Sequence, residues 1–154
     1  MSPELQAGRQ APDFTAASAS GDLRLADLLK KGKLLLAFYT EDATPLCSSE
    51  VASFKEEFAT FQELGAQVVA ISSDGLDSHK AFAQKLGGLP FPLASDPSLG
   101  IASQYGVADP ATERARRAVF VIDQNGVVLH ANSFYNPGNP GHFAEIFKAL
   151  GLEM

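Results

Sequence analysis

Two unbroken apolar runs constrain the fold of this chain more than any other feature of its sequence. KLLLAFY covers residues 33–39 and AQVVAIS covers residues 66–72. Apolar strands of this length are typical of sheets that are covered on both faces. Between the runs, apolar side chains recur every three or four residues, which predicts one amphipathic helix that ends at Gly65 and completes a βαβ unit. These side chains are Val51, Phe54, Phe58, Phe61 and Leu64.

The flanking segments extend this pattern in both directions. Residues 13–29 predict two short extended pieces around Ser20-Gly21 and then a helical turn. After the second apolar run, the pattern predicts a helix over 78–86, an extended Pro-rich piece over 89–97, and a short helix opened by Asp96-Pro97 that reaches about Tyr105. The chain then closes with an Asn-Gly hairpin with a two-residue turn and a helix. The hairpin strands are 117–123 and 127–131, and the last helix is 142–150.

These elements together predict an α/β domain with a mixed central β-sheet flanked by helices and an N-terminal β-hairpin extension. That arrangement suits a thioredoxin-like fold. With 45% hydrophobic residues and no linker or repeat, residues 1–154 are expected to form a single domain with an ordinary core.

Charge and composition exclude several classes of function. A formal net charge of −6 argues against nucleic-acid binding, because such binding needs clustered cations, and the only basic concentration is Arg114, Arg116 and Arg117. The longest apolar run is too short to span a bilayer, and the N-terminus lacks the pattern of a secretory signal, so we expect a cytoplasmic protein without membrane partners. The three histidines show no paired ligand spacing, and neither a metal nor a cofactor is predicted.

Cys47 is the only cysteine, so the chain cannot form an internal disulfide or a Cys-rich zinc site. Its position at the start of a helix favours a thiolate, because unpaired backbone N–H groups and the helix dipole meet there. Lowering a thiol pKa from about 8.5 to about 6 takes roughly 3.4 kcal/mol. A helix terminus supplies at most about 2 kcal/mol, so a cation is needed. Arg117, which enters an apolar strand, is the best candidate, although a one-residue shift of register would substitute Arg116.

Four further residues near Cys47 carry polar groups. Thr44 is held extended by Pro45 and offers a hydroxyl close to the sulfur. The simplest interpretation of Glu50 is an acidic residue favoured in the first turn of a helix, and the alternative is a carboxylate that orients Arg117. Glu41 and Asp42 are expected to be solvated loop residues.

Several separated motifs resemble the peroxiredoxins of the AhpC/TSA type, most closely the bacterioferritin-comigratory protein or PrxQ-like group. The resemblance runs from about Gly8 to the last helix. Its motifs are APDFT, LLLAFY, TPLCSSE, LPFPLASDPSLGIASQYGV and RAVFVIDQNGVV.

The resemblance implies a catalytic role for three residues. In the family pattern Pro-x-x-x-Thr-x-x-Cys, the cysteine is the peroxidatic nucleophile, and an arginine before a late strand completes the site. By position, Cys47 matches the nucleophile, Thr44 the hydroxyl residue and Arg117 the arginine. The proline is replaced by Thr40, which cannot supply the same rigid apolar cover over the sulfur.

The resemblance also implies a reaction. A peroxiredoxin reduces hydrogen peroxide or organic hydroperoxides, and many PrxQ-like members carry a second, resolving cysteine where this chain has Ala52. The chain would therefore be of the 1-Cys type and would need an external thiol from thioredoxin, glutaredoxin or a low-molecular-weight compound. Related proteins occur as monomers and as dimers, so a homodimer is a possible assembly.

Two other functions compete with the peroxidase. One is a thiol redox sensor or interaction module on the same fold that does not turn over, motivated by Thr40. The other is a thiol-disulfide oxidoreductase, against which the absence of a Cys-x-x-Cys pair argues.

Overall fold

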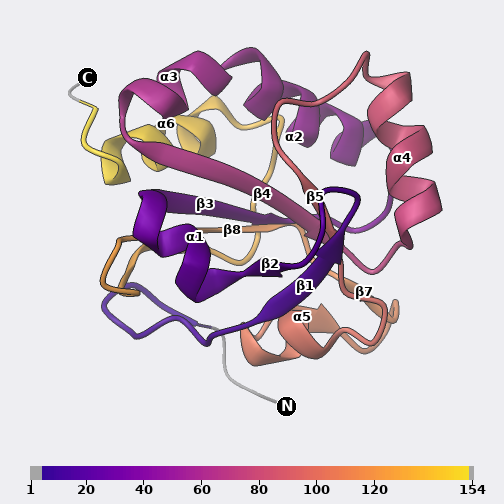
Figure 1. Ribbon diagram of the computed structural model, residues 1–154, viewed down its shortest axis with the longest axis horizontal. Coiled ribbons are helices and arrows are strands. Elements are labelled where there is room, and N and C mark those ends of the chain that lie inside the picture. The colour runs from indigo at the N-terminus through magenta and orange to yellow at the C-terminus, as the bar shows by residue number, and fades with distance from the viewer. Residues whose placement is uncertain (1–4, 153–154) are drawn as a thin grey trace.

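The computed structural model describes residues 5–152, which form a seven-stranded mixed sheet and a separate two-stranded sheet (Figure 1). The strand order in the large sheet is β2-β1-β5-β4-β3-β8-β9. The strands of this sheet are β1 (Thr15–Ser18), β2 (Leu23–Arg24), β3 (Lys33–Phe38), β4 (Ala66–Ser72), β5 (Leu93–Ser95), β8 (Ala118–Ile122) and β9 (Val128–Asn132).

The middle of the sheet confirms the predicted βαβ unit. β3 and β4 are parallel, with Leu35 opposite Val68, and β5 continues in parallel on the far side of β4. β8 and β9 then run antiparallel on the other side of β3. This mixture of directions is the α/β thioredoxin-like arrangement that the sequence predicted.

Helices cover both faces of the sheet. In Figure 1, α2, α3 and α6 lie above the central strands, α4 lies to the right, and α1 and α5 lie in front and below. The helices are α1 (Leu25–Lys31), α2 (Pro45–Glu56), α3 (Phe58–Glu63), α4 (Leu76–Lys85), α5 (Gly100–Gln104) and α6 (Pro140–Ala149).

Each face of the sheet has its own core, because successive side chains of a strand point to opposite faces. From β3, Leu36 and Phe38 enter the core that α1 and α5 cover. Leu35 and Tyr39 enter the core that the other helices cover, and Cys47 belongs to this second core. The end of β3 is therefore where the chain passes from the two cores into the loop that leads to Cys47.

The single helix predicted between β3 and β4 is wrong in one respect. The chain breaks at Glu57, whose φ of −100° and ψ of 15° are not helical, and α2 and α3 are separate helices. The backbone N–H of Glu57 still donates to the carbonyl of Ser53, so the break is a local kink. Phe54 and Phe61 remain in one core on either side of it, with ring centroids 6.1 Å apart.

The Asn-Gly hairpin forms between β8 and β9, but its turn is longer than predicted. Only Gly126 of the pair takes a positive φ, at 83°, whereas a two-residue type I′ turn requires positive φ at both residues. The N–H of Asp123 donates to the carbonyl of Val127, and the carboxylate of Asp123 accepts from the N–H groups of Asn125 and Val127. The aspartate side chain thus stabilises a wider turn.

Two helix starts also differ from the prediction. α5 begins at Gly100, not at Pro97, because the carboxylate of Asp96 reaches forward to the N–H groups of Ile101 and Ala102, at 3.1 and 2.9 Å. α6 begins earlier than predicted, at Pro140, because Asn139 caps the helix by accepting from Gly141 and His142. In both cases a side chain of a type that commonly caps helices is present, but the helix begins at a different residue than predicted.

The N-terminal hairpin is confirmed and is part of the main sheet. β1 pairs with β2 and also, antiparallel, with β5, where Ala17 lies opposite Ser95. A short second sheet, formed by β6 (Ala108–Asp109) and β7 (Arg114–Ala115), had no signal in the sequence. Its second strand carries the chain into the basic segment before β8.

Residues 5–152 contain neither a membrane-spanning helix nor a cluster of metal-ligating side chains. None of the helices there is long and apolar enough to cross a membrane. The same residues contain no group of three or more His, Cys, Asp or Glu side chains that could hold a metal ion.

Candidate active site

Cys47 lies in the first turn of α2, as the sequence predicted, and its side chain is fully buried. Thr44 is the N-cap with an extended backbone, and Pro45 fills the first helical position, where its missing N–H costs nothing. β3 delivers the chain to this point, and the loop of residues 40–44 joins the strand to the helix. The sulfur is therefore held in a packed environment at the positive end of a helix.

Backbone donors gather around this first turn. The first hydrogen bond of α2 runs from the N–H of Ser48 to the carbonyl of Thr44, at 2.8 Å. The N–H groups of Leu46 and Cys47 precede this bond, so the helix itself provides them with no acceptor. They are available to an anionic or oxygen-bearing group at the sulfur.

The Thr44 hydroxyl is already engaged as a donor. Its Oγ1 donates to the carbonyl of Glu41 at 3.2 Å, within the same loop. A hydroxyl that has donated its proton keeps its lone pairs and can still accept a hydrogen bond. The sequence placed this hydroxyl near the sulfur, and the structure adds that its open role is that of an acceptor.

Arg117 lines a cavity of about 500 Å³ beside the start of α2. Its Nε atom is buried and has no hydrogen-bond partner among residues 5–152. The cavity is also bordered by Leu46 of α2 and by Thr40, so the position where the family pattern has proline does face the site. Its complete lining is Thr40, Leu46, Asp109, Thr112, Ala115, Arg116, Arg117, Ser133, Phe134, Tyr135 and Asn136.

Arg116 also borders this cavity, but it is directed differently. Its guanidinium carbon lies 4.9 Å from the centre of the Phe134 ring, a cation–π contact. Phe134 is 67% exposed, so this pair forms part of the cavity's outer rim. Of the two adjacent arginines, Arg117 is the one whose charge acts on Glu50.

Glu50 lies one helical turn after Cys47 and is fully buried. Within the described part of the chain, neither of its carboxylate oxygens has a hydrogen-bond partner. Burial raises the pKa of Glu50 well above its ordinary value, the negative charge of Cys47 raises it further, and the charge of Arg117 opposes both effects. The same carboxyl helps to raise the pKa of Tyr135, whose buried hydroxyl is also unpaired among these residues.

This arrangement can support attack by sulfur on an oxygen atom. The buried sulfur of Cys47 lies at a helix start among backbone donors, and the Arg117 guanidinium is close enough to act on the same Glu50 carboxyl as the sulfur does. Fixed donors in a packed site stabilise developing negative charge more strongly than they would in water. Of the buried polar atoms without partners in the described residues, Nε of Arg117 and the hydroxyl of Tyr135 are donors that can receive such charge, whereas the Glu50 carboxylate is an acceptor.

A buried ion pair that no sequence pattern indicated lies next to this site. Asp42 was expected to be solvated, but its side chain is 5% exposed and lies 2.8 Å from Nδ1 of His79, which is 2% exposed. The expectation fails because His79, in α4, folds over the loop and shields it. Glu41, the neighbouring acid, is exposed as expected.

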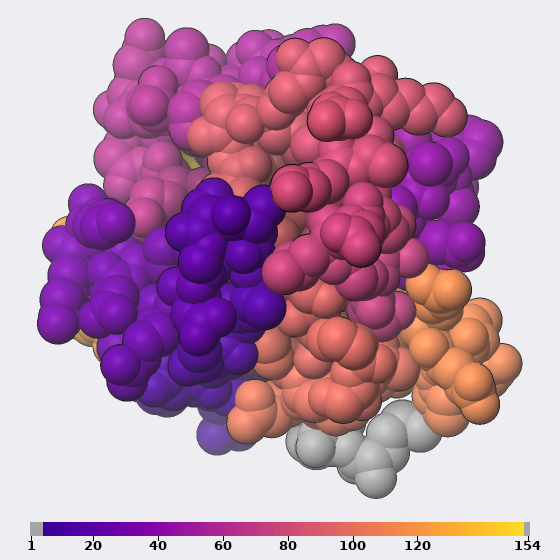
Figure 2. Space-filling model, turned by 45° about the vertical axis from the view of Figure 1, so that its right-hand side comes forward, coloured from indigo at the N-terminus to yellow at the C-terminus, as the bar shows by residue number. Residues whose placement is uncertain are grey.

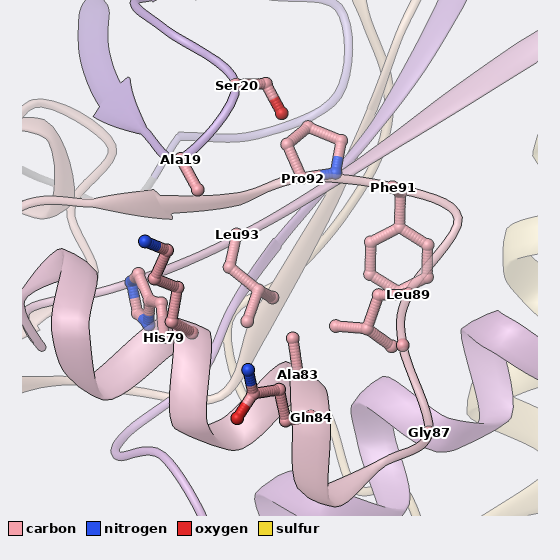
Figure 3. Close-up of a pocket in the computed structure, with 12 residues that line it drawn as sticks. Ala19, Ser20, His79, Ala83, Gln84, Gly87, Leu89, Phe91, Pro92 and Leu93 are labelled. Atoms are coloured by element: carbon pink, nitrogen blue, oxygen red, sulfur yellow. The ribbon is translucent and has the colours of Figure 1, made fainter.

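A second cavity, of about 470 Å³, lies between α4 and the segment that leads into β5 (Figure 3). Its walls are mainly apolar, with Leu89, Phe91 and Leu93 on one side and Ala83 of α4 on the other. Figure 2 shows the indigo N-terminal hairpin beside the pink α4 on this face. The second cavity shares no lining residue with the first, and its polar lining residues, among them Ser20, His79 and Lys80, are remote in sequence from Cys47, so we place the reactive site at the first.

Comparison with known proteins identifies the family of this chain. The AhpC/TSA family model matches residues 7–131. A protein of Coxiella burnetii named putative peroxiredoxin bcp is 34% identical over 152 residues, which covers 95% of this chain and 99% of the relative. Chloroplastic peroxiredoxin Q of Sedum lineare is 38% identical over 147 residues, covering 93% of this chain and 76% of the relative.

Similarity to solved structures indicates the same family. The crystal structure of peroxidoxin BcpB from Mycobacterium tuberculosis superposes with a TM-score of 0.87 at 29% identity, covering 96% of this chain and 97% of that one. The chain therefore belongs to the AhpC/TSA family and is a peroxiredoxin, a thiol-dependent peroxidase.

Proposed function

We propose that Cys47 is the peroxidatic nucleophile and that the protein reduces hydrogen peroxide and organic hydroperoxides as a 1-Cys enzyme. The observation that carries the proposal is the placement of the chain's only sulfur in the first turn of α2, buried next to a cavity that Arg117 lines. A cavity of about 500 Å³ has room for the carbon chain of a small hydroperoxide as well as for the peroxide group.

The oxidation step is a nucleophilic displacement at oxygen. The Cys47 thiolate attacks one oxygen of ROOH, the S–O bond forms and the O–O bond breaks. The leaving alkoxide takes a proton and departs as ROH, and sulfur is left as sulfenic acid. Two electrons pass from sulfur to the peroxide, so the balance needs no metal or organic cofactor.

Thr44 and Arg117 have separate roles in this proposal. The Thr44 hydroxyl, whose proton is used on the Glu41 carbonyl, accepts a hydrogen bond from the peroxide O–H. The Arg117 guanidinium and the N–H of Cys47 stabilise negative charge on sulfur and on the leaving oxygen. Arg117 keeps its charge at every working pH and can serve two acceptors at once.

An external thiol completes the cycle, because Cys47 is the only cysteine. One thiol attacks the sulfenic sulfur and releases water, and a second thiol reduces the mixed disulfide and restores Cys47. Thioredoxin, glutaredoxin or a low-molecular-weight thiol can serve. We also propose a cytoplasmic location, since such donors stay reduced there.

The test follows peroxide consumption with reduced protein and several thiol donors. Wild type should consume many equivalents of peroxide per protein, and Cys47→Ser should consume none above the uncatalysed rate. After one equivalent of peroxide without donor, mass spectrometry should find a single added oxygen on Cys47. Oxidation of Cys47 by peroxide no faster than that of free cysteine would contradict the proposal.

A thiol sensor is the second candidate, and the observation that favours it is Thr40. This residue lines the cavity in place of the expected proline, so the sulfenic acid lacks a rigid apolar cover. A sensor would be oxidised once and then over-oxidised to sulfinic acid, with little turnover by any donor. Sustained turnover with at least one donor rejects this candidate.

A further inference from the structure

The second cavity, between α4 and the segment that leads into β5, takes no part in the proposed reaction. Its third side is closed by Ala19 and Ser20, in the turn of the N-terminal hairpin. Its volume of about 470 Å³ lies within the range of small-molecule sites, roughly 300 to 1,000 Å³. The cavity is therefore large enough for a ligand of its own.

The floor of this cavity is apolar and belongs to the core of the domain. Phe91 and Leu93 line it and are only 5% and 6% exposed. Leu93 opens β5 and lies opposite Ala70 of β4, so the central sheet fixes its position. Figure 3 shows Leu89, Leu93 and Ala83 around one common space. A hydrocarbon group that enters this space leaves water, and each methylene group buried strengthens binding by about fourfold.

The turn after α4 holds the cavity in shape. Gly87 and Gly88 both line it and have φ values of 80° and 90°, which residues with a side chain rarely adopt. The N–H of Gly88 donates to the carbonyl of Ala83 at 2.8 Å, and Nζ of Lys55 donates to the carbonyl of Leu86 at 2.7 Å. These bonds fix the turn before any ligand arrives, so binding here costs little ordering of the chain.

The rim of the cavity carries polar side chains that are free to meet a ligand. Ser20, Lys80 and Gln84 line the cavity and are exposed, which places them around its mouth and not on its floor. Within residues 5–152, none of these three side chains makes a hydrogen bond or an ion pair. The rim therefore offers an ammonium, an amide and a hydroxyl to the polar end of a ligand.

The charge at the cavity favours an anion. No Asp or Glu is among the residues that line it, although the formal net charge of the whole chain is −6. The other basic residue in its wall is His79, whose Nδ1 lies 2.8 Å from Asp42 and whose Nε2 lies 2.9 Å from the carbonyl oxygen of Ala94. Both imidazole nitrogens are thus engaged, and Lys80 is the cation available to a ligand at this rim.

We propose that the second cavity binds a medium-chain fatty carboxylate, with the carboxylate at Lys80 and the hydrocarbon chain against Leu89, Phe91 and Leu93. Ten methylene-sized groups, at about the 30 Å³ of a water molecule each, take up about 300 Å³ and leave room for water at the carboxylate. The ligand matches the site in both respects, with a single anionic group for the rim and an apolar chain for the floor. This site is separate from the proposed peroxide site and does not depend on it.

Decanoate, added to the full-length isotope-labelled protein and followed by amide chemical shifts, tests the proposal directly. We expect saturable shifts in residues 19–20 and 79–93, with a Kd on the order of 1 mM. Amides of residues 133–136, beside the first cavity, should not move. Octanoate, which is two methylene groups shorter, should bind about tenfold more weakly.

The role of the charge is tested by Lys80→Met, with Lys85→Met as the matched control. Both lysines are exposed in α4, but Lys85 does not line the cavity. Lys80→Met should weaken decanoate binding by about three- to fivefold, the scale of an exposed ion pair, and should leave the binding of neutral decanol unchanged. Lys85→Met should leave both affinities within about twofold of wild type.

The role of the cavity is tested by Ala83→Leu, with Ala81→Leu as its control. Ala83 is half-buried and lines the cavity, whereas Ala81 is exposed in the same helix and does not. Leucine suits a helix almost as well as alanine, so neither change disfavours α4. Filling the cavity through Ala83→Leu should weaken decanoate and decanol alike by at least about tenfold, and Ala81→Leu should weaken neither.

Three results would overturn the inference. They are the absence of saturable shifts up to about 10 mM decanoate, shifts centred on residues 133–136, and equal decanoate affinities of Lys80→Met and Lys85→Met. Peroxide oxidation of Cys47 should match wild type in all four variants, because the two cavities share no lining residue. A Cys47 that does not react with peroxide in any of these proteins would contradict the proposed function and leave the decanoate result standing.

Discussion

Replacing Glu50 by glutamine should make the protein more stable and less active. Glu50 is fully buried, and within the described residues both of its carboxylate oxygens lack hydrogen-bond partners. A buried polar group without a partner costs about 1 to 3 kcal/mol, and a charged group costs more. Burial and the Cys47 charge, the two largest influences on this carboxyl, both disfavour its ionised form, and only Arg117 favours it. A neutral side chain of the same shape removes the part of that penalty that comes from the charge.

The gain in stability from Glu50→Gln depends on pH, and the direction of this dependence follows from the raised pKa of Glu50. The stability that neutral Glu50 provides is fully present below its ordinary pKa of 4.5 and is lost as the pH rises through the raised value. Glutamine does not titrate. At pH 7 the variant should therefore exceed wild type by about 1 to 3 kcal/mol, or roughly 2 to 4 °C in melting temperature for each kcal/mol. Below pH 4.5 this advantage should shrink.

Thermal unfolding of both proteins at pH 7 and pH 4, followed by circular dichroism, measures the difference. Peroxide oxidation of the variant should be slower, because the carboxylate that acts on Arg117 is gone. Glu50→Met, which removes the polar atoms altogether, should be at least as stable as Glu50→Gln. A variant that is less stable than wild type at pH 7, or an advantage of equal size at both pH values, would show that the burial argument is wrong.

Three further outcomes are expected. Arg117→Met should lower the rate of peroxide oxidation by about 100-fold with little change in melting temperature, since a charge-stabilising donor is removed from the cavity wall; stopped-flow with mass detection checks it. Thr40→Pro should slow over-oxidation to sulfinic acid by covering the sulfur, and equal over-oxidation of both proteins would count against that role of Thr40. Asp96→Ala should destabilise the fold by about 2 to 4 kcal/mol in urea unfolding, because two buried N–H groups lose a charged acceptor; a change below 0.5 kcal/mol would contradict it.

The sequence predicted the fold well where a pattern is local. The apolar runs at 33–39 and 66–72 became β3 and β4 within one residue, because a strand covered on both faces has an unmistakable composition. The apolar periodicity that follows Cys47 also predicted that this residue lies at the start of a helix. The kink at Glu57 was missed because no glycine, proline or cap marks it.

The site was predictable only in its sequence-local part. Cys47 and Thr44 are neighbours in the chain, and Arg117 stands before a strand that was easy to recognise. The pairing of Asp42 with His79 joins residues 37 apart, and it depends on how α4 packs over the loop. The burial of both side chains depends on the same packing, and nothing in the residues around Asp42 or around His79 indicates it.

The separation of the two cores by the sheet has a practical consequence for protein engineering. Cys47 and the ring of Tyr39 belong to the core on one side of the sheet, whereas the residues under α1 and α5 form a separate core on the other side. Substitutions that fill or rigidify that opposite core, away from Ala115, which also lines the cavity of the candidate site, should raise the melting temperature without touching the residues that meet peroxide. A thermostable version of the enzyme should be sought there first, since the usual conflict between stability and activity is confined to the other face.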